Sequence, residues 1–526
     1  MNDIFIKHTD GNATLEVAEA LKQIKMTETN VIHFEKGRYK FFRAGTFEGR
    51  FYPSNNTSGL KNVVFPILNV KDLIIDGWDS EFVFCDRIFP FIIQNSENIT
   101  LKNFNVDFSS PRHYEATVVR ADEEGIELKI DRSLYKFDAD GGSFNFYDGS
   151  YIDTTSNRKF FLNDLCKEAR VAYLVAGETT DSLDNLPASV LRTDAYETEN
   201  GIFLKYRKGS PVFRCDPNDT VFIGNEKGRE NGIFFAEFSK NISLKNIKVF
   251  RGAGMGVIAQ ICTNISIDGL EIAPKKGRDK RLSITADGLH FVNCDGKITV
   301  KNSLIEKTID DALNLHGVYS LVDEVLSSNS VRLRFGHFEQ NGLIPFQAGD
   351  IAVVNDMKKG LEIGEARVAA VDFNEDRTNI VLTFENDISE LIVPGNALEN
   401  PGRMAELEFV NNRIYDTPHM RISTCKDAIV SDNQIYNTTI VVNDLYDYWY
   451  ESGTVENLKI VNNEFKTGGN KLAIAVKSCR RGEGAKRHKN ITIVHNSFDE
   501  RIENIVTIDA VENLTMKDNV VVLKKN

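Results

Sequence analysis

Three aspartates stand out in residues 285–317, whose sequence is TADGLHFVNCDGKITVKNSLIEKTIDDALNLHG. Asp287 is followed 23 residues later by the adjacent pair Asp310 and Asp311. Carboxyl groups held a few ångströms apart do not all ionise freely, so one of them tends to keep its proton. Hydrolysis of a glycosidic bond requires one protonated acid and one ionised base. The segment therefore indicates a hydrolytic acid cluster, provided that the fold brings the aspartates together.

A repeated unit explains how the fold can do this. Each copy is a short alternating apolar segment, a turn-prone Asn, Asp or Gly, and a second apolar segment. Two pairs of equivalent positions, Ile242 with Ile265 and Ile491 with Leu514, are each 23 residues apart. Repeats of 20–50 residues are typical of solenoids, and short β-branched strands with Asn corners favour a right-handed parallel β-helix. The copies are SENITLKNFNVDF, SKNISLKNIKVF, CTNISIDGLEI, CDGKITVKNSLI, VENLKIVNNEF, HKNITIVHNSF and VENLTMKDNVVV.

In such a solenoid, residues one coil apart lie side by side, about 4.8 Å apart. The 23-residue gap then corresponds to one turn. Counted from the repeated strands, several chemically useful residues fall at one edge of the solenoid: Met255, Asp287, Asp310 and Asp311, His419 to Arg421, and Trp449 to Glu451. In a regular strand, adjacent side chains point to opposite faces, so either the chain bends at Asp310 and Asp311 or one of the two faces the interior.

Two regions break the repeat and divide the chain. We expect an N-terminal capping helix with the first coils in 1–112, an inserted β subdomain in 113–230 and the catalytic coils in 231–317. An inserted small β-barrel is expected in 318–402 and the C-terminal coils in 403–526. Both insertions alternate polar and apolar residues like antiparallel hairpins. The expected fold class is therefore all-β: a right-handed parallel β-helix with two inserted antiparallel β subdomains, one of them barrel-like, and a short N-terminal capping helix.

The composition narrows the class of partner. The chain has 526 residues, 41% of them hydrophobic, and a net charge of -13. A nucleic-acid scaffold needs a basic field, so we expect no nucleic-acid partner. We see no signal peptide and no apolar run long enough to span a membrane, so we expect no membrane partner, and localisation stays open. The seven cysteines include no CxxC pair, which disfavours a disulfide framework or a structural zinc site.

Four motifs make the chain resemble glycoside hydrolase family 110 over nearly its whole length. They are GMGVIAQ, TADGLHF, DDALNLHG and WYESG, and the segments FYPSNN and LKNVVFPILNVKDLIIDG near the N-terminus agree with them. The resemblance implies an inverting exo-α-galactosidase that removes terminal α-1,3-linked galactose from glycans, either branched like blood group B or linear. It implies that Asp310 is the general acid and that Asp287 and Asp311 serve the water. No metal or organic cofactor is implied, and a homodimer is left open.

The same motifs and the shared edge supply the expected substrate-binding residues. Trp449 stands in an aromatic stretch of the kind on which a sugar ring stacks. Each of these residues also has a simpler interpretation: an Asp often caps a β-helix corner, a His is often a satisfied turn residue, and Arg421 could lie on a solvated face. The expected substrate-binding set is His290, Asn314, His316, Arg421, Trp449, Glu451 and Gln260.

Three other functions compete with this one. A polygalacturonase-like hydrolase of acidic polysaccharide would need several Lys or Arg residues along the same edge, and the net charge disfavours it. A lyase would use the Asp pair as calcium ligands. A non-catalytic carbohydrate-binding solenoid would need no concentrated acid cluster.

Overall fold

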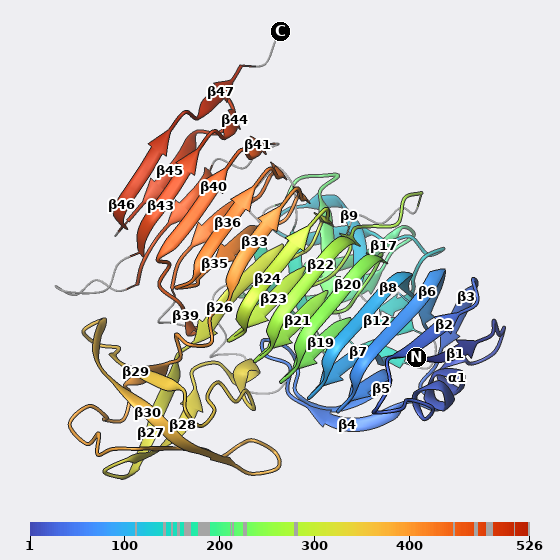
Figure 1. Ribbon diagram of the computed structural model, residues 1–526. Helices are drawn as coiled ribbons and strands as arrows, with labels where there is room; N and C mark the ends of the chain where they lie inside the picture. The colour runs from blue at the N-terminus through green and yellow to red at the C-terminus, as the bar shows by residue number, and fades with distance from the viewer. Residues whose placement is uncertain are drawn as a thin grey trace.

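The computed structural model describes residues 1–523, apart from short gaps inside this range, and is an all-β right-handed parallel β-helix. The coils stack into a rod, with the N-terminus at one end and the C-terminal coils at the other (Figure 1). This confirms the fold class expected from the repeats. The gaps are 111–112, 140–143, 149–150, 155–157, 163–169, 177–189, 211, 213–214, 225–228, 278–281, 445–447, 468–471, 480–487 and 510.

A short helix covers the first coil. It is α1 (Ala13–Leu21), and Asn12 caps its N-terminus because its side chain accepts a hydrogen bond from the Thr14 amide. Ala13, Val17 and Ala20 are buried against the core of the first coils, so the helix shields one open end of the rod.

Two long, mainly parallel sheets form the rod. Each coil adds one strand to the second sheet and one bent strand, or two short strands, to the first. The first sheet contains β1 (Asn2–Ile6), β2 (Asn30–Phe34), β3 (Arg38–Phe41), β6 (Lys71–Phe84), β8 (Glu97–Phe108), β20 (Lys240–Val249), β22 (Thr263–Ile272), β24 (Asp295–Lys301), β25 (Leu304–Glu306), β33 (Glu406–Val410), β34 (Arg413–Tyr415), β36 (Asp427–Ser431), β37 (Gln434–Tyr436), β40 (Asn457–Val461), β41 (Glu464–Lys466), β43 (His488–Val494), β44 (Ser497–Asp499), β46 (Val511–Lys517) and β47 (Val520–Val522). The second contains β4 (Phe47–Phe51), β5 (Gly59–Leu68), β7 (Phe89–Gln94), β19 (Phe234–Glu237), β21 (Val257–Gln260), β23 (Leu289–Val292), β26 (Leu313–Val318), β35 (His419–Ile422), β38 (Thr439–Val442), β42 (Leu472–Val476), β45 (Asn504–Ile508) and, paired with β26, β39 (Glu451–Ser452). In the second sheet, β4 and β39 pair antiparallel with β5 and β26.

The register between coils is the one that the repeats predict. Ile242 pairs with Ile265, and Ile491 pairs with Leu514. Inward aliphatic side chains of successive coils form a continuous buried core. Asparagines at many corners have positive φ, a conformation that Asn tolerates better than branched residues. A largely buried ladder of asparagines also joins neighbouring coils through hydrogen bonds to their side-chain oxygens: Asn412, Asn433, Asn463, Asn496 and Asn519.

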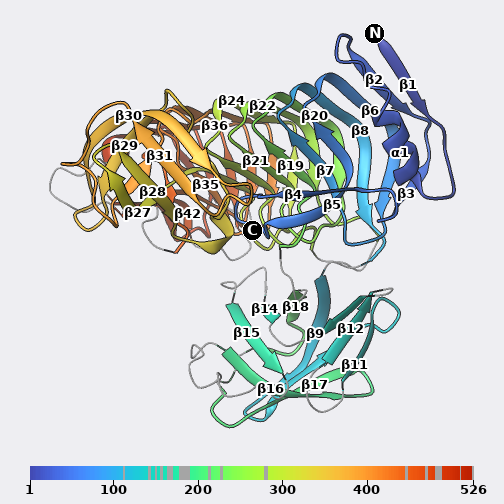
Figure 2. The same ribbon diagram turned by 90° about the horizontal axis from the view of Figure 1, so that it is seen from below.

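The first insertion projects from the side of the rod (Figure 2). It is a closed barrel with its own apolar core, so both insertions form barrels although only one was expected to. One of its pairings, β15 with β16, is parallel. The barrel contains β9 (His113–Ala121), β10 (Gly125–Lys129), β14 (Arg158–Leu162), β15 (Arg170–Ala176), β16 (Val190–Glu197), β17 (Gly201–Tyr206) and β18 (Thr220–Gly224), and a three-stranded sheet accompanies it: β11 (Lys136–Ala139), β12 (Phe144–Asp148) and β13 (Tyr151–Thr154).

The second insertion is a closed six-stranded barrel with a separate core. A buried ion pair anchors it to the rod: Arg377 contacts both carboxylate oxygens of Glu237, at 2.6 and 3.0 Å. The barrel contains β27 (Ser320–Ser327), β28 (Ser330–Phe335), β29 (Ile351–Asp356), β30 (Leu361–Phe373), β31 (Ile380–Phe384) and β32 (Ala397–Glu399), with a short 3-10 helix at Phe338–Gln340.

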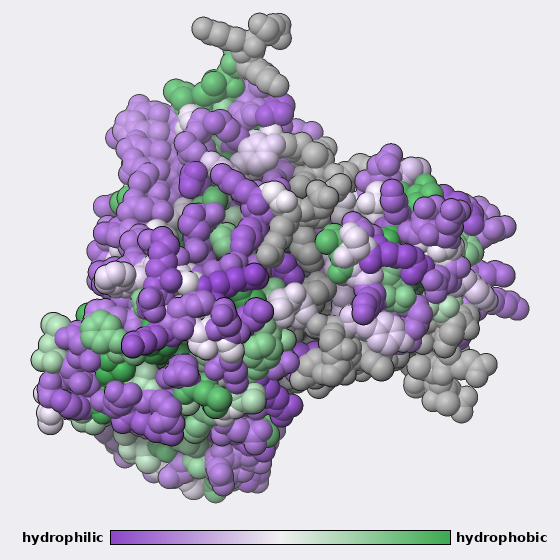
Figure 3. Space-filling model, turned by 90° about the vertical axis from the view of Figure 1, so that its right-hand side faces the viewer, coloured by the Kyte–Doolittle hydropathy of each residue, from purple (hydrophilic) through white to green (hydrophobic). Residues whose placement is uncertain are grey.

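The side of the molecule seen in Figure 3 is largely hydrophilic, with apolar side chains in small groups. At the C-terminal end of the rod, Val520 to Val522 of the last strand are more than half exposed. Among the described residues, none of the helices is long and apolar enough to cross a membrane.

Candidate active site

The site is built on the outward face of the second sheet. Along β23, Leu289 and Phe291 point into the core, so His290 points outward. His290 pairs in register with Asn314 of the next coil, and Asn314 pairs with Arg421 of the coil after that. One outward row therefore carries three of the expected site residues on neighbouring rungs.

The three aspartates lie just before these strands. Leu289 pairs with Leu313, so the coil here is 24 residues long and Asp311, rather than Asp310, occupies the rung next to Asp287. The expected 23-residue turn was thus one residue short at this coil. Asp310 and Asp311 lie in a bend before β26, so the strict alternation of a strand does not apply to them.

Asp310 is the most accessible of the three carboxyl groups. Its side chain is 38% exposed, whereas the side chains of Asp287 and Asp311 are 4% exposed. It forms an ion pair with Arg229, and its Oδ1 accepts a hydrogen bond from the Asp311 amide at 3.1 Å. Arg229 also donates to the carbonyl of Asn55 at 3.2 Å. Because it is the most exposed of the three, the carboxyl group of Asp310 is the one best placed to contact a bound substrate.

Asp311 is held as a carboxylate by two side chains of β35. Nε of Arg421 donates to its Oδ2 at 2.7 Å, and Nδ1 of His419 lies 3.1 Å from its Oδ1. Burial opposes ionisation, but the charge of Arg421 and the hydrogen bond from His419 outweigh it and lower the pKa of Asp311. Arg421 is itself oriented by Asn443, whose Oδ1 accepts from Nη1 at 3.2 Å.

Asp287 has the opposite environment. Burial, followed by the charges of Asp310 and Asp311, raises the pKa of Asp287 well above the ordinary value of a carboxyl group. Among the described residues, the one hydrogen-bond partner of its carboxyl group is His290, whose Nδ1 lies 2.7 Å from Oδ2. The surroundings therefore favour the protonated form of Asp287 and the ionised form of Asp311.

His290 and His316 are buried although they point outward from the sheet. Residues distant in sequence cover them: β39 pairs antiparallel with β26, and Asn55 approaches from the N-terminal loop. Oε1 of Glu451 accepts hydrogen bonds from Asn314 at 3.2 Å and Asn55 at 3.4 Å. Oδ1 of Asn314 is buried and has no hydrogen-bond partner among the residues that the structure describes.

Trp449 and Gln260 take different places. The guanidinium of Arg229 lies 5.5 Å from the centre of the Trp449 ring, so the half-buried tryptophan borders the acid cluster. Gln260 is fully buried. Its Nε2 donates to the carbonyl of Tyr52 and to the carboxylate of Glu237, and its Oε1 accepts from the Ser54 amide. The structure thus places Gln260 behind the site, where it supports the loop that carries Asn55.

Two residues of the site escaped the sequence analysis. Arg229 follows the charged stretch EKG, a composition typical of a solvated loop. No sequence spacing relates Arg229 to the three aspartates. Asn55 lies in FYPSNN, a segment whose pattern indicates no role for any one of its residues. Its contact with Glu451 joins residues 396 positions apart.

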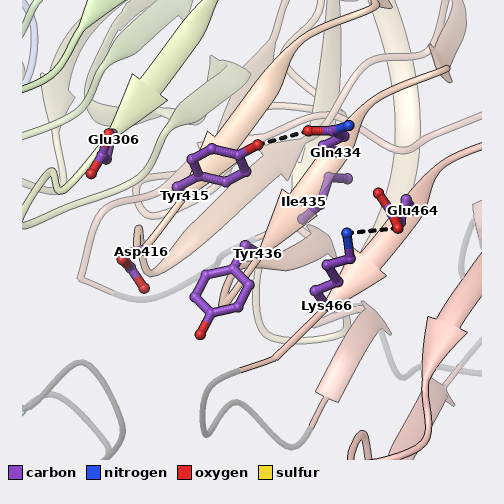
Figure 4. Close-up of a pocket in the computed structure, with 8 residues that line it drawn as sticks. All are labelled: Glu306, Tyr415, Asp416, Gln434, Ile435, Tyr436, Glu464 and Lys466. Carbon is purple, nitrogen blue, oxygen red and sulfur yellow. Dashed lines mark hydrogen bonds and ion pairs between the residues drawn. The ribbon is translucent and has the colours of Figure 1, made fainter. Parts of the chain in front are cut away.

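A separate surface pocket of about 340 Å³ lies on the first sheet, away from the acid cluster (Figure 4). Tyr415 and Tyr436 stand on neighbouring rungs of its wall, and the Tyr415 hydroxyl donates to Gln434 at 2.7 Å. None of the expected site residues lines it. Within the described ranges, no group of three or more His, Cys, Asp and Glu side chains is arranged to hold a metal ion.

Comparisons with known proteins agree with the motifs. A scan against protein-family models finds no match. The chain is 28% identical to alpha-1,3-galactosidase A of Shewanella woodyi, over 99% of this chain and 85% of that protein. It is 29% identical to alpha-1,3-galactosidase B of Bacteroides fragilis, over 86% of this chain and 77% of that protein. It is 26% identical to alpha-1,3-galactosidase B of Bacteroides thetaiotaomicron, over 97% and 83%.

Among solved structures, a tailspike protein of bacteriophage HK620 in complex with a hexasaccharide matches with a TM-score of 0.37 and 9% identity. The match covers 99% of this chain and 58% of the tailspike chain. Over nearly its whole length, this chain is homologous to alpha-1,3-galactosidases A and B. This homology confirms the resemblance of the chain to glycoside hydrolase family 110.

Proposed function

We propose that this protein is an exo-acting glycoside hydrolase that removes terminal α-1,3-linked galactose from glycans with inversion at the anomeric carbon. The observation that carries the proposal is the pairing of unlike carboxyl groups on neighbouring coils: Asp287 is buried beside His290, and Asp311 is held by Arg421. The names of the homologues supply the substrate class.

In this proposal Asp310 donates its proton to the glycosidic oxygen as the bond to the anomeric carbon breaks. Its exposed carboxyl supports that role, because the leaving group departs toward solvent. Asp287 and Asp311 hold the water on the other side of the sugar ring, and one of them takes its proton. An ion pair with Arg229 favours the carboxylate form of Asp310, which cannot donate a proton. In this proposal the guanidinium of Arg229 therefore moves away from Asp310 as the substrate enters.

The remaining side chains would bind the terminal sugar. Asn314, Glu451 and Arg421 offer an amide, a carboxylate and a guanidinium to its hydroxyl groups. Trp449 offers a ring face beside them. The side chains of His290 and His316 are fully buried, so in this proposal they support the site from beneath. Gln260 would act through the backbone of Ser54, which donates to its Oε1 at 2.8 Å.

The test is release of free galactose from α-1,3-galactobiose, measured beside the α-1,4 and α-1,6 isomers and beside para-nitrophenyl α-galactoside. Each assay is run with and without a chelator, because the proposal uses no metal. A branched substrate with a neighbouring fucose, compared with the linear disaccharide, shows which form the site prefers. Cleavage of polygalacturonate in place of these substrates, or sugar binding without cleavage, would contradict the proposal.

The proposed partner is a glycan that ends in α-galactose, with no nucleic-acid or membrane partner. A homodimer is part of the proposal only as an oligomeric state to be measured, by sedimentation of the purified protein.

A further inference from the structure

The two buried histidines beneath the acid cluster form a hydrogen-bonded chain with Asp287. Nε2 of His290 lies 3.3 Å from Nε2 of His316. The other ring nitrogens make shorter contacts: Nδ1 of His290 lies 2.7 Å from Oδ2 of Asp287, and Nδ1 of His316 lies 2.7 Å from the carbonyl oxygen of Gly317. The chain thus runs from a carboxyl group through two imidazoles to a backbone carbonyl.

The carbonyl fixes the direction of every hydrogen bond in the chain. A carbonyl oxygen can only accept, so Nδ1 of His316 carries a hydrogen. A neutral His316 then has a bare Nε2, to which Nε2 of His290 must donate. Nδ1 of a neutral His290 is bare in turn, so the hydrogen in its contact with Asp287 belongs to the carboxyl group. We infer that the His290–His316 chain holds Asp287 as a neutral carboxylic acid and leaves Asp311 as the base that takes the proton of water.

The neutrality of both imidazoles follows from their surroundings. Burial is the largest effect and lowers the pKa of His290 and of His316 to about 4. The charged groups that act on His290 are Glu451, Arg229, Asp310 and Asp311. His316 is acted on by Glu451 and Arg421, as well as by His290 itself.

Among the described residues, Glu451 is the acidic group whose contact with His316 could instead favour an imidazolium. Its Oε1 lies 3.5 Å from Nε2 of His316, farther than Nε2 of His290, and already accepts from Asn314 and Asn55. The nearer partner of His316 is therefore the other imidazole. In the alternative arrangement the same proton would sit on His316 and Asp287 would be a carboxylate, which spectroscopy distinguishes.

The role of Asp287 in the reaction rests on the proposed function. Within that function, the neutral state of Asp287 gives Asp287 and Asp311 different roles toward the water. The water forms its bond to the anomeric carbon and loses one proton to Asp311, while Asp310 gives one proton to the leaving oxygen. The proton of Asp287 stays in its contact with His290. Oδ1 of Asp287 is then an acceptor that orients the water without taking its proton.

The test is infrared spectroscopy of the substrate-free protein, so it does not depend on which sugar the enzyme cleaves. A protonated carboxyl group has a carbonyl stretching band that a carboxylate lacks. At pH 7 we expect this band in the wild type and its loss in Asp287→Asn, which assigns it. Loss of galactosidase activity would leave this result untouched, so the two proposals fail separately.

Two variants of His316 of similar size test the chain itself. His316→Gln retains an amide that can donate to Gly317 and an oxygen that can accept from His290, so the band should persist at pH 7. His316→Leu removes the acceptor, so His290 should turn its hydrogen toward Asp287 and the band should be lost at pH 7. Circular dichroism checks that both variants fold. A band that survives unchanged in His316→Leu, or that is absent from the wild type, would overturn the inference.

Discussion

Nε of Arg421 donates a hydrogen bond to Oδ2 of Asp311 across neighbouring coils, at 2.7 Å. Both side chains are largely removed from solvent, with exposures of 23% for Arg421 and 4% for Asp311. The pair therefore fixes both the position and the charge of one carboxylate in the proposed site. A water-activating base needs both properties.

Replacing Arg421 with Ala should lower kcat/KM for an α-1,3-galactoside by at least about tenfold, or about 1.4 kcal/mol. The change leaves Asp311 buried without its cation and removes a donor from the sugar site. Arg421→Lys retains the positive charge but loses the planar guanidinium, so its kcat/KM should lie between the values of the wild type and Arg421→Ala. Arg413→Ala, at an exposed position on the first sheet of the same coil, is the matched control and should leave kcat/KM unchanged. Equal values for Arg421→Ala and the control would remove Arg421 from the site.

Asp310→Asn should lower kcat by about 10²- to 10⁴-fold, because the amide keeps the shape of the side chain but cannot donate the acid proton. A substrate with a very good leaving group needs less protonation, so the deficit should shrink on such a substrate. Asp311→Asn is the comparison, since a lost base is not rescued by the leaving group. A deficit in Asp310→Asn that is the same for good and poor leaving groups would argue against the acid role.

Asn variants of the two buried aspartates should change the pH dependence of stability in opposite directions. The folded-state pKa of Asp311 is lowered, so its contribution to stability is present above the unfolded value of about 3.9 and is lost as the pH falls through the lowered folded-state pKa. The folded-state pKa of Asp287 is raised, so its contribution is present below about 3.9 and is lost as the pH rises through the raised folded-state pKa.

Melting temperatures from about pH 3 to pH 9 test this. On rising pH, the wild type should gain stability relative to Asp311→Asn around and below about pH 4. It should lose stability relative to Asp287→Asn above that pH. If both differences change with pH in the same direction, the assignment of one neutral and one ionised carboxyl group is wrong.

The sequence predicted the coils well because their register is local. The Asn-Ile-x-Leu units set the pairing of Ile242 with Ile265 within one repeat, and the alternation of inward residues sets the face of each strand. It predicted the rung of the aspartates to within one residue. It could not show that the strict two-residue alternation ends at Asp310, because the bend there has no clear turn signal.

Contacts across hundreds of residues were beyond sequence reasoning. His290 and His316 point outward on their strands, a position that suggests contact with substrate, but distant segments bury them completely. The Ser54 amide donates a hydrogen bond to Gln260 across 206 residues, a contact with a distant loop that the sequence pattern does not indicate. Such positions depend on how the loops and barrels fold over the rod, and no periodicity encodes that.

The ion pair that anchors the second barrel should matter more for stability than an exposed pair in the same barrel. Arg377→Met leaves the fully buried Glu237 without its cation and should cost about 3–5 kcal/mol. Arg332→Met, which breaks the exposed pair with Glu324, should cost less than about 1 kcal/mol. Adding Glu237→Gln to Arg377→Met should recover much of the loss. Thermal unfolding measures all three, and equal shifts for Arg377→Met and Arg332→Met would contradict the anchoring role.

The stereochemistry of the released sugar tests the assignment of all three aspartates. An inverting enzyme needs room for water between sugar and base, so its acid and base carboxyl groups should lie about 6.5–9.5 Å apart once substrate is bound. Asp310 and Asp311 are consecutive residues whose Cα atoms lie only about 3.8 Å apart, so in the bend before β26 their side chains must point away from each other as Arg229 releases Asp310. Proton NMR of the first product should then show β-galactose before mutarotation. α-Galactose appearing first would mean a covalent intermediate on one carboxylate, and Asp311, held by Arg421 as an ionised group, would become the candidate nucleophile.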